Sequence, residues 1–241
     1  KLKCLRTILL ICGGKMVDIS YKVLEWMKKV NMPGYEVVFK LLKLFVNIFF
    51  PIVYSIKKIN NKKAKRVSEK IIVSFTTFPP RIDTVWQAAY TLLYQSIKVD
   101  HVILWLARTQ FPSVEMLPRS LIRLRKFGLE IRFCDDLRPH KKYYYSMMNN
   151  PNAIVITVDD DVYYPSFLVE QLYNKHLEFP DAICCNWAHV IRCDKNNKIL
   201  PYSEWDKGVS GYDKEPSHLL NQVGYEGVLY PINSLDAQCF N

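Results

Sequence analysis

The sequence predicts an α/β fold in which helices flank a mostly parallel sheet. Short apolar runs rich in β-branched and aromatic residues alternate along the chain with segments whose apolar residues recur at helical spacing. This alternation is typical of βαβ units, whose crossovers are right-handed. The apolar runs are continuous rather than broken at every second residue, which indicates strands buried on both faces.

The body of the chain, from residue 70 onward, is expected to alternate strands with helices. Thr84 is expected to cap the first helix, and Pro118 and Gly128 are expected to mark the two ends of the second. The helices are expected at residues 84–93, 118–127, 140–148 and 165–177. The strands are expected at Ile71–Thr76, His101–Leu106, Leu129–Cys134, Ala153–Val158 and Ala182–Trp187.

The net charge of +10 is concentrated near the N-terminus. Residues 1–70 hold 16 Lys and Arg against 4 Asp and Glu, a net charge of +12, whereas residues 71–241 hold 17 against 19, a net charge of −2. Nucleic-acid-binding modules carry their basic surface on the folded module itself. A nucleic-acid partner is therefore not expected.

Residues 1–69 are predicted to form an apolar and basic segment ahead of a folded domain at residues 70–241. Val37–Ile56 is apolar, but two lysines, an asparagine and a proline interrupt it, and charges near the centre of a helix oppose insertion across a bilayer. A basic run follows, from Lys57 to Lys70. This pattern is typical of a monotopic anchor on anionic lipid, so we expect peripheral binding to the inner face of the cytoplasmic membrane. The alternative is a core helix followed by a solvated linker.

The seven cysteines include no Cys-x-x-Cys pair, which favours a reducing, cytoplasmic compartment and argues against a zinc site. The early apolar stretch Leu5–Cys12 is short and lacks a small-residue cleavage site, so no cleavable signal peptide is expected. Gly13-Gly14-Lys15 directly precedes Met16. We interpret the codons for these three residues as a ribosome-binding site in a bacterial message that has been translated in frame, so that native translation would start at Met16. A fragment boundary is the alternative explanation.

Three consecutive aspartates, Asp159, Asp160 and Asp161, directly follow the strand expected at Ala153–Val158. Open α/β sheets bind ligands at the carboxyl edge of their strands. Adjacent carboxylates repel one another unless a cation sits among them, and oxygen ligands suit Mg²⁺ or Mn²⁺. The triplet therefore predicts a metal site for a substrate that carries phosphates. A solvated acidic turn is the alternative.

The usual phosphate-binding glycine loops are missing from the sequence. No Gly-x-Gly-x-x-Gly follows a predicted strand, and there is no Walker-type loop. Dinucleotide-dependent redox chemistry and P-loop nucleotide hydrolysis are therefore not expected.

Three stretches, taken together in this order and spacing, indicate a family. They are IIVSFTTFPPRI at residues 71–82, HKKYYYSMMNNPNAIVITVDDDVYYP at 140–165 and GYEGVLYPINSL at 224–235. Over about residues 70–235 the chain resembles the GT-A-type nucleotide-sugar glycosyltransferases, of the bacterial kind that assembles surface polysaccharide such as capsule or lipopolysaccharide. The resemblance implies a GT-A-like fold and transfer of a sugar from a nucleotide-sugar donor to a glycan or lipid-linked acceptor.

The resemblance also implies roles on the donor side of the site. Asp161 would be the principal ligand of Mn²⁺ or Mg²⁺, and Asp159 would share the metal or face the ribose, with Asp160 in either place. The nucleotide-sugar would further contact Thr76, Thr77, Arg81 and Lys142. A lysine or guanidinium pairs well with phosphate, but turn chemistry for the threonines and a solvent-exposed helix face for Lys142 are the alternatives.

On the acceptor side the resemblance points to the glycine-rich stretch and to a histidine after the fifth predicted strand. Gly224, Glu226, Gly227 and His189 are the candidates there, although the family tends to have glycine at position 225 or 226. Inverting enzymes of this type need a carboxylate to deprotonate the acceptor hydroxyl. Asp236 is a candidate by position only, and we expect the catalytic domain to be truncated just after it.

Two other functions fit parts of the sequence. An apolar strand followed by Asp-x-Asp also begins haloacid-dehalogenase-type phosphohydrolases, in which Asp159 would be the nucleophile and Asp161 the general acid. That motif usually follows the first strand of its domain, whereas three predicted strands precede it here. A non-catalytic, degenerate transferase subunit is the other alternative.

Overall fold

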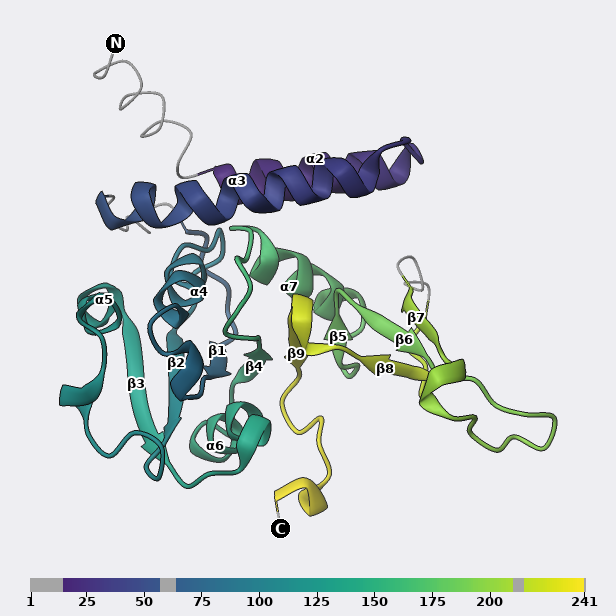
Figure 1. Cartoon of the computed structure of the whole chain (residues 1–241). Coiled ribbons are helices and arrows are strands. Elements are labelled where there is room, and N and C mark those ends of the chain that lie inside the picture. The colour runs from purple at the N-terminus through teal and green to yellow at the C-terminus, as the bar shows by residue number, and fades with distance from the viewer. Residues whose placement is uncertain (1–14, 57–63, 210–214, 241) are drawn as a thin grey trace.

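The computed structural model describes residues 15–56, 64–209 and 215–240. Within them, a six-stranded sheet forms the centre of the molecule, a smaller three-stranded sheet projects from one side, and a helical hairpin lies across one end (Figure 1). The predicted α/β class is confirmed.

The central sheet has the strand order β3-β2-β1-β4-β9-β5. β1 pairs in parallel with β2 and with β4, and β2 pairs in parallel with β3, whereas β9 is antiparallel to both of its neighbours. The sheet is therefore mostly parallel, as predicted. Its strands are β1 (Ile71–Thr76), β2 (His101–Ala107), β3 (Leu129–Cys134), β4 (Ile154–Thr157), β5 (Cys184–Cys185) and β9 (Val228–Tyr230).

The fifth predicted strand, Ala182–Trp187, is shorter than expected. Only Cys184–Cys185 joins the central sheet, and β6 (Ala188–Val190) then begins a separate antiparallel sheet of order β7-β6-β8. The other two strands of this sheet are β7 (Asp206–Val209) and β8 (Leu220–Gln222). Neither these two strands nor β9 was predicted from the sequence, because β7 and β8 lack a continuous apolar run and the apolar run of β9 is only three residues long.

The helices of the body agree with the prediction to within a few residues. They are α4 (Val85–Leu92), α5 (Arg119–Leu124), α6 (Lys141–Asn149) and α7 (Leu168–Glu178). A 3-10 turn, Arg125–Phe127, extends α5, and Gly128 then adopts a left-handed conformation with φ of +108°, as expected of a helix C-cap. Thr84 precedes α4, but its hydroxyl donates to the carbonyl oxygen of Arg81 (3.1 Å) instead of capping the helix. That part of the prediction is wrong.

Both faces of the central sheet are covered, as the continuous apolar strands predicted. On one face Val73, Phe75 and Leu104 belong to the main hydrophobic core, which the side chains of α4, α5 and α7 complete. On the other face Ile72 and Trp105 form a smaller cluster with Tyr145 of α6.

The N-terminal hairpin consists of α2 (Met16–Lys29) and α3 (Tyr35–Ile56). Phe50 of α3 is fully buried in the main core and stacks on Tyr163 with ring centroids 4.3 Å apart. The carboxylate of Asp18 on α2 accepts hydrogen bonds from the backbone N–H and the hydroxyl of Ser166, each 2.7 Å long. The hairpin is therefore packed and hydrogen-bonded onto the segment that follows β4.

No helix in the described residues is both long and apolar enough to cross a membrane. Three predicted features lie wholly or partly outside the described residues. They are the first part of the basic run, residues 57–63, the early cysteines Cys4 and Cys12, and residues 1–14 of the segment expected to be untranslated.

Candidate functional site

The order of the strands in the sheet reverses between β1 and β4. From β1 the chain builds β2 and β3 on one side and then returns to form β4 on the other side. Ligands of open α/β sheets bind where the strand order reverses in this way, outside the carboxyl ends of the strands. The acidic triplet follows β4 at this point, and Thr77 and Arg81 follow β1.

Asp160 connects the ends of the two strands. Its side chain is buried, accepts a hydrogen bond from the hydroxyl of Thr77 (2.5 Å) and pairs with Nη1 of Arg81 (2.7 Å). The same guanidinium nitrogen lies 3.0 Å from Oδ2 of Asp161. The hydrogen bond from Arg81 to Asp160 raises the pKa of that guanidinium. Asp160 therefore has internal partners, while Asp161, with 49% of its side chain exposed, remains open to solvent.

Asp159 pairs with Lys142. The ammonium lies 2.7 Å from Oδ1 of Asp159 and also donates to the carbonyl oxygen of Val158 (3.3 Å). A Cβ added at Gly224 would lie 3.2 Å from Nζ of Lys142 and 3.3 Å from Oδ1 of Asp159. The absence of a side chain at Gly224 therefore lets the glycine-rich turn approach the ion pair closely.

A buried hydrogen-bond network holds Lys142 in place. The hydroxyl of Ser74 on β1 donates to the carbonyl oxygen of Lys142 (2.6 Å) and accepts from the hydroxyl of Ser146 (2.7 Å), which in turn accepts from the indole N–H of Trp105 (2.8 Å). The sequence analysis missed both serines. Ser74 could have been identified from the sequence, because it is a polar residue within an otherwise apolar strand and buried polar groups need hydrogen-bond partners.

Tyr164 is a second positioning residue, and it was not predicted from the sequence as part of the site. Its hydroxyl accepts from the backbone N–H of Asp159 (2.8 Å) and lies 3.2 Å from the carbonyl oxygen of Tyr225. Burial raises the pKa of Tyr164 well above its usual value, so the phenol stays protonated and can donate. It thereby links the acidic triplet to the glycine-rich turn.

Three predicted site residues form hydrogen bonds with groups outside the acidic triplet and its partners. Thr76 donates its hydroxyl to the carbonyl oxygen of Trp105 (2.8 Å) on the neighbouring strand β2. His189 is buried in the three-stranded sheet, where its Nδ1 accepts from the N–H of Gly208 (3.0 Å). Asp236 is exposed and accepts from the N–H of Gln238 (2.8 Å) at the start of the final 3-10 turn.

The two remaining acceptor candidates also have structural surroundings. Gly227 has φ of +87°, and a Cβ there would lie 3.2 Å from Leu172 and 3.3 Å from Leu168 of α7. Glu226 is partly buried, and its burial raises the pKa of the carboxyl group, an effect that the charge of Lys28 on α2 opposes. The side chain of Glu226 therefore lies within reach of the hairpin.

Asp135 and Asp136 follow β3, and the side chain of Asp136 stabilises a turn there. The carboxylate of Asp136 accepts from the N–H of Arg138 (2.9 Å) and pairs with the ammonium of Lys141 (2.5 Å). The hydrogen bond from Lys141 lowers the pKa of Asp136.

The donor set fits a hard divalent cation shared with a substrate. In the described part of the chain no three His, Cys, Asp or Glu side chains converge into a closed metal cage. Mg²⁺ in phosphate-binding sites is held by one or two carboxylates, with substrate phosphates completing its coordination. Asp161 and Asp159, whose side chains are 49% and 36% exposed, offer such carboxylates.

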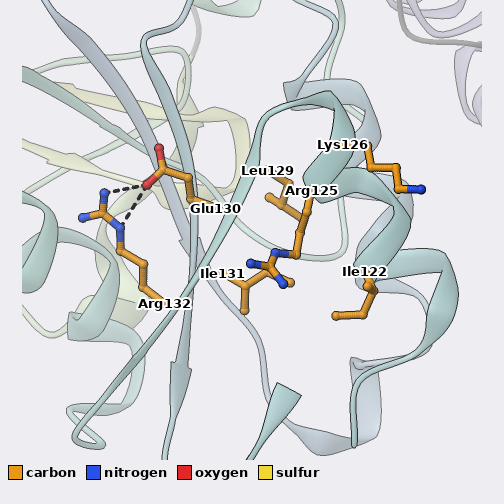
Figure 2. A pocket seen from close by; sticks show the side chains of 7 residues that line it. All are labelled: Ile122, Arg125, Lys126, Leu129, Glu130, Ile131 and Arg132. Carbon is orange, nitrogen blue, oxygen red and sulfur yellow. Dashed lines mark hydrogen bonds and ion pairs between the residues drawn. The ribbon is translucent and has the colours of Figure 1, made fainter. Parts of the chain in front are cut away.

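A separate, open hollow of about 620 Å³ lies along the edge strand β3 and the end of α5. Figure 2 shows its lining residues, among which Glu130 is held by Arg132. None of the lining residues belongs to the acidic triplet or its partners. The hollow is therefore distinct from the site at β1 and β4.

Comparisons with known proteins show similarity in structure but not in sequence. No protein-family model matches the chain, and no curated protein sequence matches it. Similar solved structures include CMP:2-keto-3-deoxy-manno-octonic acid synthetase complexed with CTP, at 13% identity and a TM-score of 0.43 over 71% of this chain and 76% of the other. Another is 4-diphosphocytidyl-2C-methyl-D-erythritol synthase, at 7% identity and a TM-score of 0.42 over 69% and 76%. Similarity at this level assigns no activity to this chain.

Proposed function

We propose that this chain is a metal-dependent glycosyltransferase. It would move a sugar from a nucleoside-diphosphate donor to a hydroxyl group of a glycan or lipid-linked acceptor, in the synthesis of a surface polysaccharide. One observation carries the proposal: segments far apart in the sequence converge on the acidic triplet at the end of β4, and they bring cations, a hydroxyl and a bare glycine to it. The converging residues are Thr77, Arg81, Lys142 and Gly224.

The charge of this cluster suits a metal–diphosphate complex. The three carboxylates are paired with two cationic side chains, Lys142 and Arg81, which leaves a formal charge of −1. A divalent cation would change that to +1, and a diphosphate would then be attracted. The same cluster without a metal would repel a diphosphate, so the charge count supports metal dependence.

The side chains divide into ligand-holding and positioning groups. Asp161 and Asp159 would hold Mn²⁺ or Mg²⁺, which when bound neutralises charge that develops on the departing diphosphate. Lys142 would supply a fixed positive charge to a phosphate oxygen. Asp160, through Thr77 and Arg81, keeps the end of β1 against the end of β4. Gly224 leaves room for the donor beside Lys142.

The phosphohydrolase alternative receives no support from the fold. Three strands, β1 to β3, precede the triplet along the chain, as predicted, and Asp159, which would be the nucleophile, is ion-paired with Lys142. Trapping with a phosphate-mimicking metal fluoride would favour the phosphohydrolase. Turnover of any nucleotide sugar would exclude the non-catalytic alternative.

Thermal unfolding in the presence of nucleoside diphosphates, with and without Mn²⁺, tests the proposal. A ligand at a hundred times its Kd stabilises the folded state by about 2.7 kcal/mol, which for a chain of this size raises Tm by about 5 to 10 °C. We expect this shift for at least one diphosphate, and only with the metal present.

Asp161→Asn should abolish the metal-dependent part of the shift. Asp181→Asn, at an exposed aspartate outside the cluster, is the matched control and should retain it. The proposal fails if no nucleoside diphosphate stabilises the protein with Mn²⁺ or Mg²⁺, or if both variants behave alike.

A further inference from the structure

Helix α3 carries an exposed apolar stripe along one side. Val37, Leu41, Leu44, Phe45 and Ile48 are between 45% and 61% exposed. Their spacing repeats every three or four residues, so these side chains lie on one face of the helix over several turns. We call these five residues the outer stripe.

The outer stripe is not needed for packing within the chain. The residues that bury α3 against the main core are Val46, Phe50 and Val53. At 100° per residue these three lie on the far side of the helix from the outer stripe. Helix α3 thus has one apolar face turned to the core and another turned outward.

Positive charge accompanies the outer stripe. Lys40 and Lys43 are exposed on one side of the stripe, and Lys40 borders it, where a lysine stem can follow apolar surface while its ammonium group stays at the edge. Directly after α3, residues 57–66 contain six Lys and Arg and no Asp or Glu. An apolar face with a basic flank is complementary to a lipid surface with anionic headgroups, because one part enters the acyl boundary and the other pairs with phosphate.

The partner helix α2 contributes exposed apolar residues of its own. Ile19, Trp26 and Val30 are about half exposed, and Met32 in the turn between the helices is 42% exposed. Tryptophan is enriched at the level of lipid headgroups, since its ring is apolar and its N–H is polar.

We propose that the α2–α3 hairpin lies flat on an anionic lipid bilayer, with the outer stripe of α3 at the boundary between headgroups and acyl chains. Crossing the bilayer is not part of the proposal, in agreement with the absence of a spanning helix among the described residues. A bilayer is preferred to a second copy of the chain because basic residues, and not acidic ones, cluster after α3.

The hairpin would also determine where the candidate site lies. Asp18 of α2 is bonded to Ser166 and Phe50 of α3 is stacked on Tyr163, within a few residues of Asp161. A hairpin on the bilayer therefore holds the acidic cluster near the lipid surface. If the chain is the proposed transferase, a site close to the bilayer would favour a lipid-linked acceptor. Only this statement about the acceptor rests on the proposed function.

Co-sedimentation with lipid vesicles tests the proposal on the full chain. The stripe variant is Leu44→Gln/Ile48→Gln. The control is Lys43→Gln/Asn47→Gln, which also introduces two glutamines but places them on the adjacent polar face of α3. With vesicles of phosphatidylcholine and phosphatidylglycerol, we expect the stripe variant to bind at least tenfold more weakly than the wild type. On the same vesicles the control should bind about fivefold more weakly than the wild type, which is the effect of removing one lysine from an anionic surface. On vesicles of phosphatidylcholine alone, the control should bind as well as the wild type.

A second measurement does not depend on how the stripe variant folds. Vesicles that contain a brominated lipid should quench part of the tryptophan fluorescence of the wild type, and Trp26→Phe should remove that part. The proposal is overturned if the wild type does not bind anionic vesicles, or if the stripe variant and the control bind equally well. It is also overturned if light scattering shows that the wild type is a dimer which the stripe variant dissociates.

The two proposals fail separately. Vesicle binding requires neither donor nor metal, so Asp161→Asn should bind vesicles like the wild type. If the chain binds vesicles but is not stabilised by any nucleoside diphosphate, the proposed transferase function is refuted and the proposed binding to a bilayer is not.

Discussion

The ammonium of Lys142 lies 2.7 Å from the carboxylate of Asp159, beside the space that a side chain at Gly224 would enter. These residues come from α6, from the end of β4 and from the turn before β9, and the ion pair is only partly exposed. Lys142 and Asp159 both belong to the second of the three stretches on which the resemblance to nucleotide-sugar transferases depends, and Gly224 belongs to the third.

Gly224→Ala is expected to reduce donor binding while leaving the fold stable. The added methyl group would lie within 3.3 Å of the flexible end of Lys142 and of Asp159, so the ion pair must shift by a few tenths of an ångström. We expect affinity for the nucleoside diphosphate to fall by about tenfold, or about 1.4 kcal/mol, measured by calorimetry with Mn²⁺ present.

Gly227→Ala is the contrasting variant for that experiment. At φ of +87°, with Leu172 and Leu168 close by, an alanine there is strained and should lower the free energy of unfolding by about 1 to 2 kcal/mol. Equal effects of the two variants on binding and on stability would contradict the assignment of Gly224 to the donor site.

Neighbouring lysines on α6 should separate binding from stability. Lys142→Met removes the cation at Asp159 and should weaken diphosphate binding by at least tenfold. Lys141→Met instead leaves the partly buried carboxylate of Asp136 without its partner, and should lower the free energy of unfolding by about 1 to 2 kcal/mol without changing affinity. Urea denaturation and calorimetry on both variants check this. Loss of binding in Lys141→Met alone would reverse the assignment.

Asp160→Ala is expected to destabilise the protein more than a substitution at either neighbouring aspartate. The buried carboxylate accepts from Thr77 and Arg81, and its removal leaves the hydroxyl of Thr77 without this partner and leaves Arg81 with Asp161 alone. Since Arg81 is partly exposed, we expect a loss of about 2 kcal/mol rather than the full cost of breaking a buried pair. Urea denaturation measures it, and a loss no greater than that of Asp161→Ala would show that Asp160 has no positioning role.

Asp18→Ala should loosen the hairpin from the body. It removes two hydrogen bonds to Ser166, with an expected cost of about 1 to 3 kcal/mol. Ser166→Ala removes only the bond from the hydroxyl and should cost less. Hydrogen exchange should become faster in α2 and in residues 162–168 of the first variant, whereas unchanged exchange there would mean that apolar packing alone holds the hairpin.

Much of the central sheet was predictable because its strands are continuous apolar runs. Ile71–Thr76 matches the expected bounds, since burial on both faces leaves a clear signal in the sequence. Leu129–Cys134 also matches its expected bounds, although it is an edge strand whose middle residues are only partly buried. The three-stranded sheet was not predictable: β6 and β8 are three residues long and are stabilised by pairing with each other. Such strands lack a local pattern, because their stability comes from partners distant in the sequence.

The candidate site was predictable in its charged residues and not in its supports. Asp159, Asp161 and Lys142 were expected near a donor phosphate, and the structure brings Asp159 and Lys142 into contact. Ser146 and Tyr164 could not be identified, since a serine in a helix or a tyrosine after a strand is ordinary until its partner is known.

The sequence by itself determined the class of fold, the acidic end of the fourth strand and the apolar, basic character of the N-terminal region, because each is written in consecutive residues. Only the tertiary structure decided that Asp160 holds β1 against β4, that Gly224 stands beside the ion pair of Lys142 and Asp159, and that α3 turns one apolar face to the core and another outward. These features depend on contacts between segments tens of residues apart, and no local pattern of residues specifies which distant groups will meet.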